Sequence, residues 1–165
     1  MGEPNSKELH RIAVTGIIWK EVGGIRTYLI TKRAPHKKAW PGKWTVPGGG
    51  VETDDYMQNE AAYQNSESPQ WYNALENSLR REIREEVGVE VSEVQYLLDV
   101  AFIRPDATPT LVLSFYCKYA SGEVALDDDA TEYAWITAAM AKDYEFIQGI
   151  DHEIALVDER LAKQQ

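Results

Sequence analysis

Residues 81–89 read REIREEVGV and are the most informative stretch of this 165-residue chain. On a helix, Glu82, Glu85 and Glu86 recur at i, i+3 and i+4, so they share one face about one turn apart. Like charges at that spacing repel by about 0.2–0.5 kcal/mol per pair in isolated helices, so a cation is expected to face them. Clustered carboxylate oxygens suit Mg²⁺ or Mn²⁺ better than Zn²⁺, which prefers nitrogen and sulfur ligands. The alternative is a solvated acidic face with intrahelical pairs such as Arg81 with Glu85.

The same helix carries an apolar stripe. Leu75, Leu79, Ile83 and Val87 recur every four residues, which predicts packing against a sheet. At about 100° per residue, the glutamates fall beside this stripe, at the rim of the packed interface. Gly88 suits a left-handed C-cap that ends the helix after Val87.

A glycine turn precedes the helix, because residues 47–52 read PGGGVE. The turn and residues 81–89 together resemble the Nudix box: Gly, five residues, Glu, seven residues, then Arg-Glu-aliphatic-x-Glu-Glu-x-Gly-aliphatic. The second half matches at every fixed position, and the likeness extends to residues 30–34 and 44–49. The resemblance implies an α/β fold of the Nudix type, an α/β/α sandwich around a mixed β-sheet.

The first half of the box departs from the family pattern. Five residues separate Gly49 from Asp55, which stands where the family has Glu. From Asp55 to Arg81 there are then 25 intervening residues instead of seven. About 18 residues are therefore inserted within the box. Asp55, Glu52 or Glu67 takes the part of the first glutamate, or that part is absent. The insertion, residues 54–73, is interpreted as surface decoration, as a lid over the substrate or as a dimer contact.

Composition limits the class of protein. Hydrophobic residues make up 44% and charged residues 27%, which is ordinary for one globular domain spanning residues 1–165. The net charge of −10 argues against polymeric nucleic acid as a partner, although a small anionic substrate remains compatible. Cys117 is the only cysteine, so no intrachain disulfide forms. No signal segment or membrane span is recognisable, and a cytoplasmic location is expected; a homodimer is left open.

Hydrophobic patterning predicts the order of the elements. After a loose lead over residues 1–9, strands are predicted at residues 12–19, 25–31, 44–46, 91–104, 111–119 and 133–137, the first two joined by a hairpin at Gly23 and Gly24. Helices are predicted at residues 55–65, at 69–87 and, as an amphipathic helix on the far face of the sheet, from 143 to the end.

A basic loop precedes the glycine turn. Residues 32–43 hold six basic or potentially basic groups in an otherwise acidic chain. They form a solvated loop or a phosphate cradle. Arg33 is the first choice as a phosphate ligand, because it matches an arginine of the family and guanidinium geometry suits phosphate; Lys32 is a second choice. Trp44 and Tyr116, like Trp40 and Phe102, are either core residues or platforms for a nucleobase.

The resemblance also implies roles for residues of the box. The metal ligands would be the carbonyl of Gly48 and the carboxylates of Glu82, Glu85 and Glu86, with Mg²⁺ or Mn²⁺ as cofactor. Arg81 would hold the acidic cluster by an ion pair. Glu85 or Glu86 is considered first as general base, and Glu132 or Asp129 could take this part instead.

The implied reaction is hydrolysis of a nucleoside diphosphate linked to another group. The short chain and Lys32-Arg33 ahead of the box resemble the branch that cleaves a (d)NTP to NMP and pyrophosphate. Pro105, 16 residues beyond Val89, favours instead an ADP-ribose or sugar-nucleotide pyrophosphatase. A third alternative is a non-catalytic nucleotide sensor, which the complete acid triad argues against.

Overall fold

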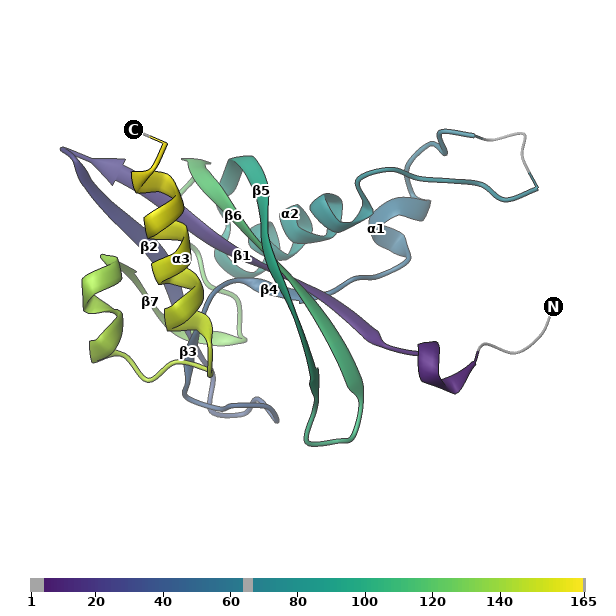
Figure 1. Ribbon diagram of the computed structural model, residues 1–165, viewed down its shortest axis with the longest axis horizontal. Coiled ribbons are helices and arrows are strands. Elements are labelled where there is room, and N and C mark those ends of the chain that lie inside the picture. Colours follow the sequence, from purple (N-terminus) through teal and green to yellow (C-terminus); the bar gives the residue numbers. More distant parts are fainter. Residues whose placement is uncertain (1–4, 64–66, 165) are drawn as a thin grey trace.

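The computed structural model describes residues 5–63 and 67–164, and Figure 1 shows its arrangement. The strands are β1 (Arg11–Val22), β2 (Ile25–Arg33), β3 (Trp44–Thr45), β4 (Gly48–Gly50), β5 (Glu90–Ile103), β6 (Pro109–Ser121) and β7 (Ala130–Ile136). The helices are α1 (Asp54–Met57), α2 (Ala74–Val87) and α3 (Ile150–Ala162), with 3₁₀ turns η1 (Ser6–Glu8) and η2 (Ala138–Asp143).

All seven strands belong to one mixed sheet. Its main order is β3-β2-β1-β6-β5, while β4 pairs with β1 and β7 pairs with β2. The β1–β6 pair is parallel and the other pairs are antiparallel. The predicted hairpin is confirmed, because Val22 pairs with Ile25 across Gly23 and Gly24, both at positive φ.

A helix covers each face of this sheet. Side chains alternate along β1, so Val14 and Ile18 belong to the cluster under α2, whereas Ile17 belongs to the cluster under α3. The stripe predicted on α2 is confirmed, with Leu79, Ile83 and Val87 fully buried. On the opposite face α3 contributes a buried set that comprises Ile150, Ile154, Val157 and Leu161. The predicted α/β/α sandwich with a mixed sheet is therefore confirmed (Figure 1).

Two predicted helices start later than expected. Helix α2 begins at Ala74 rather than near residue 69, because Asn73 adopts a left-handed conformation with φ of 61°. The C-terminal helix begins at Ile150 rather than at residue 143, because Gly149, with φ of 99°, separates it from the 3₁₀ turn and the loop before it. In both cases a left-handed residue sets the boundary, which hydrophobic periodicity does not report.

The insertion projects from the front of α2, away from the sheet (Figure 1). Of the helix predicted at 55–65, only residues 55–57, which belong to α1, are helical among those described, and residues 64–66 lie outside the described ranges. The insertion folds on itself, since the Ala62 N–H donates to the Gln70 carbonyl and the Trp71 indole N–H donates to the Asn59 carbonyl. These bonds use backbone groups that a longer α2 would have needed.

The remaining features concern the core and the termini. Cys117 is fully buried, and burial raises the pKa of its thiol to about 12. Within residues 5–63 and 67–164, no helix has both the length and the apolar character needed to cross a membrane.

Candidate active site

The predicted glycine turn is strand β4 in the structure, although it is still called the glycine turn here, and it lies against two glutamates of α2. The Gly48 N–H donates to Glu86 Oε2 at 2.8 Å. A Cβ on Gly48, which has φ of 154°, would lie 2.2 Å from the Val14 carbonyl oxygen. A Cβ on Gly49 would lie 2.4–2.5 Å from the Glu82 carboxyl atoms. Both glycines are therefore required sterically, because the backbone approaches β1 on one side and the acidic helix face on the other.

Arg81 ties the acidic helix to the turn and to the insertion. Its Nη1 lies 2.9 Å from Glu82 Oε1 and 2.9 Å from Glu85 Oε2, and its Nη2 donates to the Gly50 carbonyl at 3.0 Å. Its Nε donates to Asp55, whose side chain is only 1% exposed. The carboxylates around the guanidinium raise the pKa of Arg81, and the hydrogen bond from Arg81 to Asp55 is the largest contribution.

The contacts of Asp55 address the interruption of the box. Asp55 accepts hydrogen bonds from Arg81 and from the Glu52 N–H at 2.8 Å. Burial alone would raise the pKa of Asp55, but these hydrogen bonds outweigh burial and hold the pKa below its usual range. Of the three acids considered for the family's first glutamate, Asp55 is the one that contacts Arg81 through its side chain. Asp55 lies at the start of the insertion, in α1, and the rest of the insertion follows it before α2 begins.

The two acids that face the turn, Glu82 and Glu86, are partly desolvated by burial. Burial raises the pKa of Glu86 to about 8, and the nearby charges of Glu82 and Asp127 add to the rise, whereas the Gly48 N–H and Arg33 oppose it. Burial likewise raises the pKa of Glu82, with Arg81 opposing the rise. Two desolvated carboxylates that repel each other are stabilised by a cation between them.

The donor atoms fit a hard divalent metal ion in part. Glu82, Glu86 and the Gly48 backbone bring only oxygen ligands to the turn, as Mg²⁺ or Mn²⁺ requires. Within the described ranges, no three His, Cys, Asp or Glu side chains converge closely enough to hold a metal ion. Glu85, the remaining predicted ligand, is 58% exposed in its side chain and contacts Arg81. The third carboxylate would therefore have to leave Arg81 to complete the set.

Two adjoining cavities open beside this turn. A polar cavity of about 670 Å³ is lined by Glu82 and by a set of cationic side chains: Arg11, Arg33, His36, Lys37, Lys38 and Arg104. A second cavity of about 540 Å³, here called the apolar cavity, runs toward the start of α3 and is lined largely by Val46, Val100, Val112, Ile147 and Ile150. Residues that line both are Arg33, Trp40, Gly48, Glu86, Phe102, Val112 and Asp129. None of the described residues of the insertion lines either cavity, which gives no support to the lid interpretation.

Arg33 stands where the two cavities meet. It ends β2, and its Nε donates to the Ala39 carbonyl at 2.9 Å, which fixes the guanidinium. Burial lowers the pKa of Arg33, while the carboxylates of Glu86 and Asp129 oppose this change. Asp129 in turn pairs with Lys37 and His36 of the basic loop. The loop is therefore held against the cavities, which favours the phosphate cradle over a solvated loop.

Several predicted site residues lie elsewhere. Lys32 and Glu132 face each other across β2 and β7 and pair at 2.7 Å, outside both cavities. Trp44 packs edge-to-face on Tyr144 at a centroid distance of 4.9 Å, also outside both. Tyr116 is 3% exposed, and its hydroxyl group donates to Gln95. The structure thus places neither Trp44 nor Tyr116 where a nucleobase could stack, because both rings are used in packing.

Three residues of the cavities were missed. Arg11 and Arg104 lie next to predicted strands but far apart in sequence, and the sheet brings them into the polar cavity. Glu153 of α3 lines the apolar cavity. The only signal for Glu153 in the sequence is that it comes directly before Ile154, a residue of the buried helix face. The prediction of an amphipathic helix did not distinguish Glu153 from the other acids of that helix.

Comparison with known proteins assigns the chain to a family. A family model described as the NUDIX domain matches residues 9–155, so the chain belongs to the Nudix family. Together with its curated relatives, this makes the protein a hydrolase that acts on phosphoric anhydrides. Nucleoside triphosphatase NudI of Salmonella paratyphi B is 27% identical over 139 residues, covering 78% of this chain and 86% of the relative. NudI of Escherichia coli O17:K52:H18 is 29% identical over 119 residues, covering 66% and 72%.

Solved structures share the fold. The NUDIX domain of Shewanella oneidensis NrtR, crystallised with ADP ribose, superposes with a TM-score of 0.71 at 16% identity and covers 96% of this chain and 94% of that one. The MutT protein of Methanosarcina mazei Go1 superposes with a TM-score of 0.66 at 20% identity, covering 94% and 98%. At these identities the likeness concerns the fold alone.

Proposed function

We propose that the protein is a Mg²⁺- or Mn²⁺-dependent pyrophosphohydrolase that cleaves a nucleoside triphosphate to a nucleoside monophosphate and pyrophosphate. The observation that carries the proposal is the polar cavity, in which the desolvated Glu82 and Glu86 lie opposite Arg11, Arg33 and Arg104. Acids for a metal ion and guanidinium groups for phosphate oxygens are what a triphosphate chain requires. The named relatives, which are nucleoside triphosphatases, support this choice of substrate.

The arginines bind and orient the triphosphate. Guanidinium groups match phosphate in geometry, and charge that develops on phosphate oxygens is stabilised by donors already in place. Arg33 is held by the Ala39 carbonyl, so its orientation does not depend on substrate. A divalent metal ion held by Glu82, Glu86 and the Gly48 carbonyl would neutralise phosphate charge and lower the pKa of the attacking water.

One of the acids around the turn would accept the proton of the attacking water. In the reaction a water oxygen bonds to phosphorus, a P–O bond of the α–β bridge breaks, and pyrophosphate leaves. We propose Glu86 as the first candidate for general base, because it lines both cavities, and a metal ion bound to the same carboxylate would lower its pKa and keep it ionised. Glu85 becomes a candidate when it separates from Arg81. Asp129 also lines both cavities, but its hydrogen bond from Lys37 lowers its pKa, which makes it a weaker base.

A hydrolysis screen with identified products tests the proposal. Wild type, Glu86→Gln and the exposed control Glu159→Gln would be assayed with Mg²⁺ on nucleoside triphosphates, ADP-ribose and dinucleoside polyphosphates. We expect metal-dependent release of NMP and pyrophosphate, a loss of about 10²-fold or more in Glu86→Gln, and no change in the control. Better turnover of ADP-ribose would assign a sugar-nucleotide pyrophosphatase instead. Nucleotide binding without turnover of any substrate would indicate a sensor.

A further inference from the structure

A buried carboxyl group in the apolar cavity has no role in the reaction described above. Glu153 lies in the first turn of α3, is 8% exposed and lines the apolar cavity. Its Oε2 is buried without a hydrogen-bond partner in the described part of the chain. Burial raises the pKa of Glu153, while a hydrogen bond with the Ser114 hydroxyl opposes this rise. Oε2 is therefore an open acceptor.

An open acceptor in such a place indicates a ligand. A buried polar atom without a partner is costly, and native proteins retain few of them without a function. The Ser114 Oγ lies 2.9 Å from Thr15 Oγ1, so this hydroxyl group already has a partner other than Glu153. The neighbouring His152 on the helix is exposed. Oε2 is thus positioned to accept a donor that enters through the cavity.

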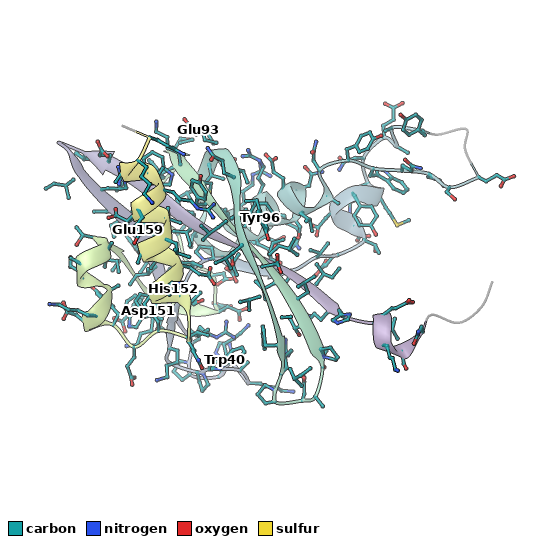
Figure 2. All side chains as sticks on the ribbon, in the orientation of Figure 1. Trp40, Glu93, Tyr96, Asp151, His152 and Glu159 are labelled. Carbon is teal, nitrogen blue, oxygen red and sulfur yellow. The ribbon has the colours of Figure 1, made fainter. Side chains whose placement is uncertain are left out.

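The cavity has the size and lining expected for a nucleoside. Its volume of about 540 Å³ falls in the range of small-ligand sites. Trp40 and Phe102, with ring centroids 6.0 Å apart, stand where the apolar and polar cavities meet. Figure 2 shows Trp40 beyond the N-terminal end of α3, with Asp151 and His152 on the first turn. A nucleotide with phosphates at Glu86 and Arg33 would place its base toward Glu153.

We propose that Glu153 reads the nucleobase, accepting through Oε2 the ring N–H of a lactam base such as uracil, thymine or guanine. The inference rests on the proposed nucleotide substrate. An ionised carboxylate is an acceptor only. It gains a hydrogen bond from a lactam N–H, whereas the ring nitrogen of cytosine and adenine presents a lone pair at that position, so these bases could donate only by shifting to offer their exocyclic amino group. Buried hydrogen-bonding groups of this kind discriminate strongly between substrates, because the wrong base leaves them unpaired.

The matched pair dUTP and dCTP tests the proposal, because the two substrates differ only at the base edge. We expect wild type to favour dUTP in kcat/KM, and Glu153→Gln to reduce the dUTP-to-dCTP ratio by at least about tenfold, because an amide can donate to cytosine. Glu159→Gln, the same change at an exposed position of α3, should leave the ratio unchanged. Equal losses on both substrates, or a wild-type preference for dCTP, would overturn the proposal.

Binding of monophosphates separates this inference from the proposed reaction. Calorimetric titration of dUMP and dCMP into wild type and Glu153→Gln in EDTA needs no turnover. Tighter binding of dUMP that is lost in the variant supports base reading even if no triphosphate is hydrolysed. Equal affinity for dUMP and dCMP in wild type, or no binding of either, overturns it even if hydrolysis proceeds.

Discussion

Replacing Glu86 by glutamine should stabilise the metal-free protein at alkaline pH. The folded protein raises the pKa of Glu86 from its usual 4.5 to about 8, chiefly by burial. The folded state therefore binds a proton that the unfolded chain releases above about pH 4.5. The contribution of Glu86 to stability is most favourable below that pH, declines as pH rises toward 8, and is constant above it.

The size of the effect follows from the two pKa values. A difference of about 3.5 pKa units corresponds to about 5 kcal/mol at 1.36 kcal/mol per unit, as an upper bound. Glutamine keeps an oxygen that accepts from the Gly48 N–H, so the variant loses the charge but retains this bond. We expect Glu86→Gln to raise the free energy of unfolding by about 2–4 kcal/mol at pH 9, and by about zero at pH 4.5.

Urea unfolding in EDTA across this pH range measures the difference. Titrating groups that do not interact with Glu86 cancel when the variant is compared with wild type at each pH. Glu85→Gln is the matched control, since its exposed carboxylate should matter by about 1 kcal/mol or less. Added Mg²⁺ should raise the free energy of unfolding of the wild-type protein at pH 9, and should raise that of Glu86→Gln much less. A variant that is less stable than wild type at pH 9, or a difference that does not vary with pH, would refute the reasoning.

Three further changes test the contacts of the site. Gly49→Ala should weaken Mg²⁺ binding by tenfold or more while the protein stays folded, because its Cβ would displace Glu82; calorimetric titration measures this, and unchanged affinity would exclude the close approach. Asp55→Asn should destabilise the protein by about 1–3 kcal/mol near neutral pH, because Arg81 loses a buried anion. Since the pKa of Asp55 is lowered in the folded protein, this loss of stability should vanish as pH falls through that pKa. Chemical unfolding measures the difference, and a difference that stays constant with pH would contradict the prediction. Arg33→Lys should lower kcat/KM for a triphosphate by about tenfold or more with little change in stability, because a lysine lacks the forked geometry of guanidinium. Steady-state kinetics measure this effect, and a variant with full activity would show that Arg33 does not bind phosphate.

The sequence alone was sufficient for the acidic helix and for the layers of the fold. Leu79, Ile83 and Val87 repeat with helical period, and such local repetition determines which face of a helix is buried. The turn predicted at Gly48 and Gly49 was wrong, because both residues lie in strand β4 and pair with β1, but the close backbone approach that a glycine run permits is confirmed. The helix boundaries could not be predicted, since the left-handed residues Asn73 and Gly149 set them and hydrophobic periodicity does not report a left-handed backbone.

Only the tertiary structure decided which side chains share the cavities. Asp55 reaches Arg81 across an insertion. Arg11 of β1 and Arg104, which directly follows β5, both line the polar cavity, because sheet pairing brings distant residues together. It also directed Tyr116 into the core and left Glu153 Oε2 open in a cavity. Local patterns record which way a residue faces along its own element. The partner it meets depends on how the elements pack, which no single stretch of sequence encodes.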